Sequence, residues 1–205
     1  PNKKNDWESI KQMELQSASK ADLTLAITPT DETVLKNLGV ENVSIIPNIH
    51  YLKYAPENDV SEFEKRTGLL FIGGYSHTPN IDAVIWLIKD IMPHVWKVIP
   101  TMHVTLLGSN PTKDVLNLKS DKVDVPGFIA DVSSYFHTHK VFVAPLRYGS
   151  GMKGKIGQSI EYGLPIVSTE IGVEGMNMHH EQHALIAASE IEIAENIIKL
   201  YGDQN

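Results

Sequence analysis

The sequence predicts a Rossmann-like, doubly wound parallel α/β sheet, preceded by a smaller α/β segment. One reason is a series of short, continuous apolar runs after residue 68, as expected of parallel strands covered on both faces. Another is the helical periodicity between those runs, because strands that alternate with helices form parallel sheets. The expected strands are residues 69–72, 103–107, 123–125, 141–144, 166–168 and 184–186.

The clearest of the expected helices has six apolar residues spaced to fall on one helix face. These residues are Ile81, Val84, Ile85, Ile88, Ile91 and Met92. A shorter helix is expected to end near Tyr162, and a final amphipathic helix contains residues 191–198. Ligands of such sheets bind on the loops after the strands' carboxyl ends, so we single out residues 73–80, 108–113, 126–131, 145–155 and 169–175.

Residues 1–47 are expected to form the smaller segment. A helix is expected from Trp7 to about Ala21, followed by strands at residues 23–28 and 43–47. A second helix lies between them, with Thr30 as its expected N-cap and Gly39 as its C-cap. Residues 48–67 lack periodicity and are expected to be a linker with room for one helical turn, and residues 68–205 form the main domain.

Composition excludes several classes of protein. The absence of cysteine removes disulfides and thiolate metal sites and fits a reducing compartment. A formal net charge of -7 argues against a nucleic-acid partner, whose affinity would need a basic surface. No apolar run approaches the roughly 18 residues of a membrane-spanning helix, and no signal peptide is visible. The first residue is not Met, so we expect a fragment or a processed chain.

The strongest local signal is the segment from Pro145 to Ile156, which joins an expected strand to a helix. Glycines let a backbone adopt positive φ and approach a ligand closely, and amides at a helix start favour a phosphate. The alternative is a flexible turn with solvated lysines. The segment holds three glycines and three basic residues: Gly149, Gly151, Gly154, Arg147, Lys153 and Lys155.

The same segment matches the dinucleotide fingerprint G-x-G-x-x-G, with Glu170 after the next strand as the acidic residue. Four residues, Pro145 to Tyr148, separate the expected strand from the first glycine, whereas the fingerprint glycine follows its strand almost directly. The motif also falls after several βα units. A site for NAD or FAD is therefore the weaker alternative.

Histidines raise the question of a metal site. His179, His180 and His183 do not match the zinc-protease spacing, so we expect a polar loop there and no metal. His137 and His139 alternate like an exposed strand edge or loop, and we assign them no role.

Several motifs in fixed order resemble the C-terminal domain of GT-B, family-4-type (group 1) retaining glycosyltransferases. The resemblance covers about residues 68–202, and residues 7–47 resemble the closing segments of the preceding N-terminal domain. The motifs are Phe71-Ile72-Gly73-Gly74, Thr78-Pro79-Asn80-Ile81-Asp82-Ala83-Val84, Met92-Pro93, Val125-Pro126-Gly127-Phe128, the segment 145–156, residues 163–169 and residues 171–175.

The resemblance implies a role for particular residues. Gly74, Gly151, Met152, Lys153 and Lys155 would face the diphosphate and sugar of the donor. Phe128 and Ile129 would lie near the base. Two glutamates that the family places before Gly163 are replaced here by Ser150, at the donor sugar, and Gln158, at the ribose. An amide can still bind ribose hydroxyls. Asn80 is expected either to cap a helix or to contact the ligand, and Glu174 to line the pocket or serve structure.

The resemblance implies transfer of a hexose-type sugar from a UDP- or GDP-sugar to an acceptor, with retention and without a cofactor or metal. The acceptor would be a saccharide or lipid-linked sugar, as in polysaccharide biosynthesis. It would bind mainly to the missing N-terminal domain, so the fragment alone is expected to be inactive. The expected location is the cytoplasm, at the inner face of the membrane through peripheral association. The alternatives are a non-catalytic nucleotide-binding domain and an NAD-dependent oxidoreductase.

Overall fold

A computed structural model of the chain describes residues 6–48 and 63–202. The chain divides into two compact units, Pro1–Ile49 and His50–Asn205. Most of the expected linker, residues 49–62, lies outside the described residues.

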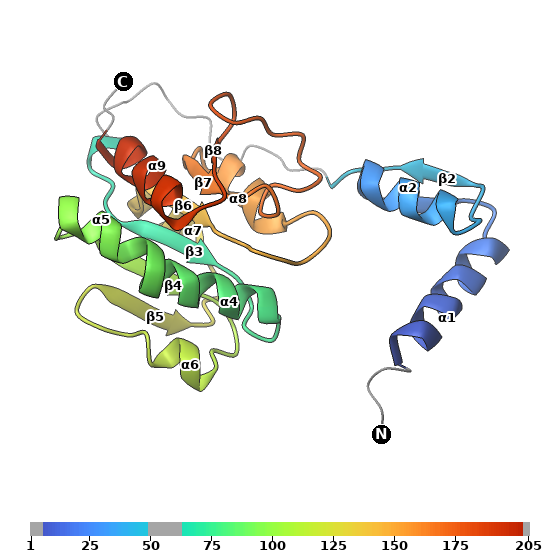
Figure 1. Cartoon of the computed structure of the whole chain (residues 1–205), viewed down its shortest axis with the longest axis horizontal. Coiled ribbons are helices and arrows are strands. Elements are labelled where there is room, and N and C mark those ends of the chain that lie inside the picture. Colours follow the sequence, from blue (N-terminus) through green and yellow to red (C-terminus); the bar gives the residue numbers. More distant parts are fainter. Residues whose placement is uncertain (1–5, 49–62, 203–205) are drawn as a thin grey trace. The chain divides into compact units, whose positions relative to one another are not determined.

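The larger unit is built on six parallel strands in the order β5-β4-β3-β6-β7-β8 (Figure 1). Counted from β3, this is the order 3-2-1-4-5-6 of the doubly wound Rossmann fold, which confirms the predicted fold class. The direction of winding reverses between β3 and β6, so the switch point lies between these two strands. The strands are β3 (Leu69–Ile72), β4 (Val104–Leu107), β5 (Val123–Gly127), β6 (Val141–Ala144), β7 (Ile166–Ser168) and β8 (Leu185–Ile186).

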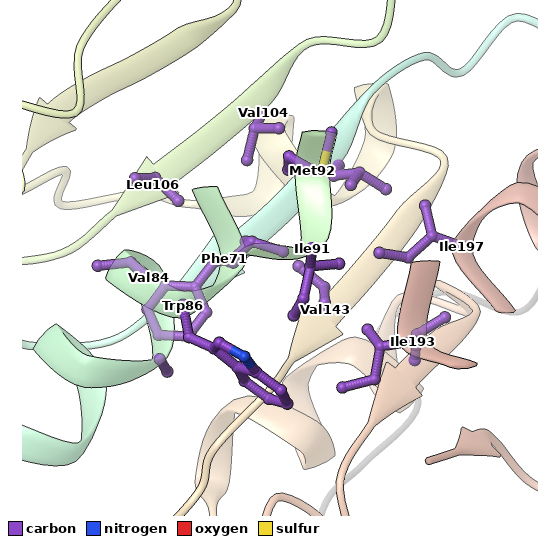
Figure 2. Close-up of a cluster of buried hydrophobic side chains, with 14 of the residues drawn as sticks. Phe71, Val84, Trp86, Ile91, Met92, Val104, Leu106, Val143, Ile193 and Ile197 are labelled. Atoms are coloured by element: carbon purple, nitrogen blue, oxygen red, sulfur yellow. The ribbon is translucent and has the colours of Figure 1, made fainter. Parts of the chain in front are cut away.

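Helices cover both faces of the sheet, and β4, β6, β7 and β8 are therefore buried along their whole length. One core lies under the helices α4 (Thr78–Trp86), α5 (Met92–Val98) and α9 (Glu190–Gly202), and includes Val115 of α6 (Lys113–Leu116). Figure 2 shows this core, where Phe71 and Val143 of the sheet meet Val84, Ile91 and Ile197 of the helices. A second core lies under α7 (Ser133–Thr138) and α8 (Gly154–Glu161).

The predicted helix at residues 81–92 is part of a longer helical segment that runs from Thr78 to Val98. Its middle turn, Leu87–Ile91, is a π-helix, and α5 begins directly after it. Pro93 follows, and a proline has no N–H to donate to the carbonyl one turn earlier. A π-turn beside a proline lets the segment continue with its apolar face still against the sheet.

The smaller unit is a βαβ arrangement, with the parallel strands β1 (Thr24–Ala26) and β2 (Val43–Ile45) joined by α2 (Pro29–Asn37) and preceded by α1 (Asp6–Lys20). Its elements agree with the prediction except at the two caps of α2. The N-cap is Thr28, not Thr30, and its Oγ1 accepts a hydrogen bond from the N–H of Asp31 at 3.0 Å. Pro29 then occupies the first turn, a position that its fixed φ favours. Gly39 follows the C-cap residue Leu38 with a φ of +89°.

Candidate functional site

Two loops meet at the switch point of the sheet, one after β3 and one after β6. The loop after β6 lies against the first turn of α4, because a Cβ on Gly149 would stand 3.2 Å from Cγ of Pro79. The Nζ of Lys155, in the first turn of α8, donates to Oδ1 of Asn80 in α4 at 2.6 Å. The predicted ligand-binding loops 73–80 and 145–155 are therefore neighbours in the fold.

The backbone of the loop after β6 needs glycine at two places. Gly149 has a φ of +112° and Gly151 a φ of +81°, both in the region that other residues rarely adopt. The third glycine of the segment, Gly154, does not have a positive φ, contrary to our expectation, because it is already the first residue of α8. Residues 149–153 thus form an irregular turn that leads directly into the amino end of a helix.

The Arg147 side chain is paired with Asp82 of α4. Its Nε donates to Oδ2 of Asp82 at 2.9 Å, a second nitrogen pairs with Oδ1, and the guanidinium lies over the ring of Trp86. The hydrogen bond to Asp82 raises the pKa of Arg147. In this arrangement Arg147 holds the start of the loop to α4.

Lys153 is paired inside the protein. Its Nζ lies 2.8 Å from Oε2 of Glu174 and 3.3 Å from the carbonyl oxygen of Gly149, and only 9% of its side chain is exposed. Glu174, which we expected to line the pocket or serve structure, thus fixes this lysine. The pair connects the loop after β6 to the segment that follows β7.

Lys155 lies deeper than a solvated lysine. Its Nζ is 4.5 Å from the centre of the Phe71 ring in β3, a distance at which the ring face attracts a cation. Burial, and in second place the charge of Lys153, lowers the pKa of Lys155 from 10.5 to about 7. A lysine in this position can bind an anion as an ammonium or give up its proton near neutral pH.

Asn80 does not cap α4, so the first of the two roles that we considered for it is wrong. The N-cap residue is His77, and the Asn80 side chain instead donates from Nδ2 to the carbonyl oxygen of Gly74 at 2.8 Å. Nothing local in the chain pointed to its partner Lys155, which is 75 residues away. Asn80 was nevertheless accessible to prediction as a polar side chain in the first turn of a helix that follows a glycine loop.

The loop after β3 is held in place by a buried tyrosine and a backbone hydrogen bond. Tyr75 is 1% exposed, and its N–H donates to the carbonyl oxygen of Ser109 at 2.9 Å. Burial raises the pKa of the Tyr75 phenol. Gly74 lies close to the loop after β4, because an added Cβ would stand 3.3 Å from Oγ of Ser109. This loop carries no lysine or arginine to offer a ligand.

The remaining predicted site residues are more open to solvent. Ser150 is exposed, and Gly151, Met152 and Gln158 are half-buried. The side chains of Ser150 and Gln158 form no hydrogen bond with any residue that the structure describes. Phe128 is 73% exposed after β5, while Ile129 packs against the second core. Three strand spacings separate β5 from β6, roughly 14 Å, so a ligand that touches both loops must be extended.

Two cavities open at the carboxyl ends of β7 and β8, beside the switch point. One, of about 340 Å³, is lined by Leu146, Arg147 and residues 169–171. The other, of about 380 Å³, shares Glu170 with it and includes His180. Lys153 and Lys155 line neither of them. The two lysines instead lie at the switch point, where the loop after β6 enters α8.

The histidines have structural partners. His179, His180 and His183 lie in a turn, and Nδ1 of His180 accepts the N–H of Ile186 at 2.9 Å. Within the described ranges 6–48 and 63–202, no group of three or more acidic or histidine side chains could hold a metal ion. His137 belongs to α7, which corrects the expectation of a strand edge or loop, whereas His139 follows the helix and lies in a loop as expected. The ring of His139 bonds Tyr135 O at 2.7 Å and Thr105 Oγ1 at 2.8 Å.

Among the helices of the described residues, none is both long enough and apolar enough to cross a membrane.

The fold and this arrangement define a Rossmann-like domain whose candidate ligand site is a glycine-containing, lysine-bearing loop at the switch point. The family model of the glycosyl transferases group 1 matches residues 66–203, and the chain belongs to this family.

A curated relative is an uncharacterized 44.6 kDa protein in the cps region of Klebsiella pneumoniae, 25% identical over 178 residues. The match takes in 82% of this chain and 44% of the relative, so the chain spans less than half of that protein.

Solved glycosyltransferases share the fold. A mutant of S. aureus TarM, in complex with fondaparinux, alpha-GlcNAc-glycerol and UDP, superposes with a TM-score of 0.77 at 19% identity, over 95% of this chain and 40% of its own. The Anabaena protein Alr3699/HepE, in complex with UDP and glucose, gives a TM-score of 0.69 at 15% identity, over 96% and 59%. The pneumococcal O-GlcNAc transferase GtfA, in complex with UDP and GlcNAc, gives 0.69 at 19%, over 92% and 40%.

Proposed function

We propose that this chain supplies the donor site of a glycosyltransferase that transfers a sugar from a nucleoside diphosphate sugar to an acceptor, with retention of configuration. The observation that carries the proposal is the meeting of the glycine-containing loop, the amino end of α8 and two lysines at the switch point. Membership of the group 1 glycosyltransferases supports it. So do the UDP complexes of TarM, HepE and GtfA, which share the fold.

The diphosphate is the part of the donor that this site suits best. The turn at residues 149–153 brings backbone N–H groups to the amino end of α8, where the helix dipole favours negative charge. Lys153 and Lys155 add two cationic side chains in a chain with a net charge of -7. In the reaction, these groups stabilise the charge that develops on the leaving nucleoside diphosphate. No metal or cofactor is needed for that role.

The two ends of the donor would lie on either side of the diphosphate. We assign the base to Phe128 and Ile129, after β5, and the ribose to the amide of Gln158. The sugar would face Ser150 and Gly74, together with the backbone of Gly151 and Met152. The open side chains of Ser150 and Gln158 leave their hydrogen-bonding groups available for such contacts.

The acceptor belongs to another part of the protein in this proposal. The smaller unit would be the closing part of an N-terminal domain that binds a saccharide or lipid-linked acceptor, at the cytoplasmic face of a membrane. The chain by itself would then bind donor without turnover. The alternative is a domain that binds nucleotide and has lost catalysis, which the replacement of two carboxylates by Ser150 and Gln158 favours. Nucleotide binding without transfer by the full-length protein would decide for it.

The test is calorimetric titration of the chain with UDP, GDP and their sugars. We expect one nucleotide to bind with a dissociation constant below about 1 mM. This limit corresponds to a binding free energy of about -4 kcal/mol. Lys153→Ala is expected to weaken binding about tenfold or more, since a charged hydrogen-bonding partner is lost. Lys97→Ala is the matched control, because this exposed lysine lies at the end of α5, on the amino-terminal side of the sheet. No binding, or equal affinities in the two variants, would contradict the proposal.

A further inference from the structure

One side chain joins the two loops of the candidate site. Asn80 donates to the carbonyl oxygen of Gly74, in the loop after β3, and accepts from the Nζ of Lys155, at the start of α8. The sequence separations of these contacts are 6 and 75 residues, so the second contact is purely tertiary. Asn80 therefore connects the loop after β3 with the start of α8 on the other side of the switch point.

The space for this contact is made by the glycine at the end of β3. A Cβ on Gly73 would stand 2.7 Å from Cγ of Asn80. Any other residue at this position would push the amide away from its two partners. The amide is therefore confined between the backbone of Gly73 and the side chain of Lys155.

Lys155 keeps hydrogen-bonding capacity in this position. An ammonium has three donors, and within residues 6–48 and 63–202 its only hydrogen-bond partner is Oδ1 of Asn80. The ring of Phe71 attracts the cation without accepting a conventional hydrogen bond. At least one donor is left for an anion.

We propose that Asn80 is a positioning residue for the donor diphosphate: its amide holds the Lys155 ammonium beside the loop at Gly74, at the carboxyl ends of β3 and β6 where the diphosphate binds. The inference rests on the proposed function and adds a residue that touches no donor atom. An amide suits the task because it accepts from lysine and donates to a carbonyl with the same group. A carboxylate would accept from Lys155 but could not donate to Gly74.

The charge state of Lys155 gives this role its own signature. The charged group that faces Lys155 is Lys153, which is itself paired with Glu174, while Asn80 and Phe71 are uncharged. Loss of the Asn80 hydrogen bond in Asn80→Ala removes an interaction that favours the ammonium, so the pKa of Lys155 should fall further. The carboxylate of Asn80→Asp should raise it.

The experiment has two arms. The first follows the side-chain NMR signals of Lys155 during pH titration of the free chain, assigned with Lys155→Arg. We expect its pKa to rise by about one unit or more in Asn80→Asp and to fall in Asn80→Ala. Equal titration in wild type and both variants would overturn the inference whether or not nucleotides bind.

The second arm measures the affinity for UDP-glucose and UDP-GlcNAc from about pH 6 to about pH 9, because a sugar diphosphate lacks the terminal phosphate that titrates near pH 6. Wild-type affinity should fall as pH rises above the pKa of Lys155. Asn80→Ala should begin this fall at lower pH and bind about tenfold more weakly at pH 7. Asn80→Asp should bind more weakly at low pH, because it adds a negative charge, and should begin its fall in affinity at higher pH than wild type. A uniform loss at every pH would mean a structural role only and overturn the inference. Absence of binding to wild type would overturn the proposed function, and with it the ligand assigned here.

Discussion

Lys153 Nζ lies 2.8 Å from Oε2 of Glu174, an ion pair between the loop after β6 and the segment after β7. The lysine is 9% exposed and the glutamate 31%. Because Lys153 belongs to the glycine-containing loop, we expect a phosphate bound there to replace Glu174 as its anionic partner. The pair therefore holds the loop in place before a ligand arrives.

Substituting Glu174 tests this exchange. In Glu174→Gln, Lys153 keeps its contact with Gly149 O but loses a competing negative charge. We expect UDP to bind several-fold more tightly, on the order of 0.5–1 kcal/mol, because one charge near a surface site contributes about this much. Calorimetry at low salt measures the change. Weaker binding by Glu174→Gln would show that the carboxylate itself supports the ligand.

Two glycines make a matched pair for stability. A Cβ on Gly172 would stand 2.5 Å from the carbonyl oxygen of Ala144, whereas one on Gly154 would meet nothing within 4 Å. Gly172→Ala should therefore lower the free energy of unfolding by about 1–3 kcal/mol through overpacking. Gly154→Ala, in the first turn of α8, should raise it by up to about 1 kcal/mol. Urea unfolding of both variants checks the contrast, and similar effects at both positions would contradict the packing described around β7.

The pair of Arg147 with Asp82 is open to a double-mutant cycle. The two side chains are 48% and 24% exposed, so their coupling should be small despite the bidentate geometry, about 0.3–1 kcal/mol. Arg147→Lys should retain less than about half of it, since an ammonium cannot form the fork to both oxygens. Unfolding free energies of Arg147→Ala, Asp82→Ala and the double variant supply the cycle. A coupling near zero would mean that the stacking on Trp86 holds the loop by itself.

His139 should make stability depend on pH. Burial lowers its pKa below 6.5, although the hydrogen bond to Tyr135 acts in the opposite direction. Below pH 6.5 the unfolded chain therefore binds a proton that the folded chain takes up only at lower pH, and the free energy of unfolding falls as pH decreases. His139→Gln removes this contribution. We expect wild type to lose more stability than this variant from about pH 7.5 to about pH 5.5, and equal losses would contradict it.

The sheet was predictable because its strands are short apolar runs, which carry their own signal. All six strands, the helix at residues 81–92 and the last helix appear where periodicity placed them. The cap of α2 was misassigned by two residues because Thr28 and Thr30 are equally suitable by type, and only Pro29 between them decides. The π-turn at Leu87–Ile91 is likewise a local adjustment that apolar spacing does not reveal.

The sequence predicted which loop forms the candidate site, but it did not predict which side chains pair with one another there. Glycine and lysine spacing marked residues 145–155, but whether a lysine points to solvent or to a partner depends on residues far away in sequence. Lys155 meets Asn80 across 75 positions, and Lys153 meets Glu174 across 21. Arg147, in turn, pairs with Asp82 across 65 positions. Such pairings follow from the strand order, which the sequence left open.

Binding of a nucleoside diphosphate sugar at the switch point between β3 and β6 is the central proposal. Backbone amide NMR spectra of the isotope-labelled chain, titrated with UDP and GDP, test it most directly. We predict the largest shift changes at Gly74 and at residues 149–155, with smaller ones at Phe128 and Ile129. Changes confined to the amino-terminal side of the sheet, such as at Lys97 and Met102, or no changes with either nucleotide, would contradict it.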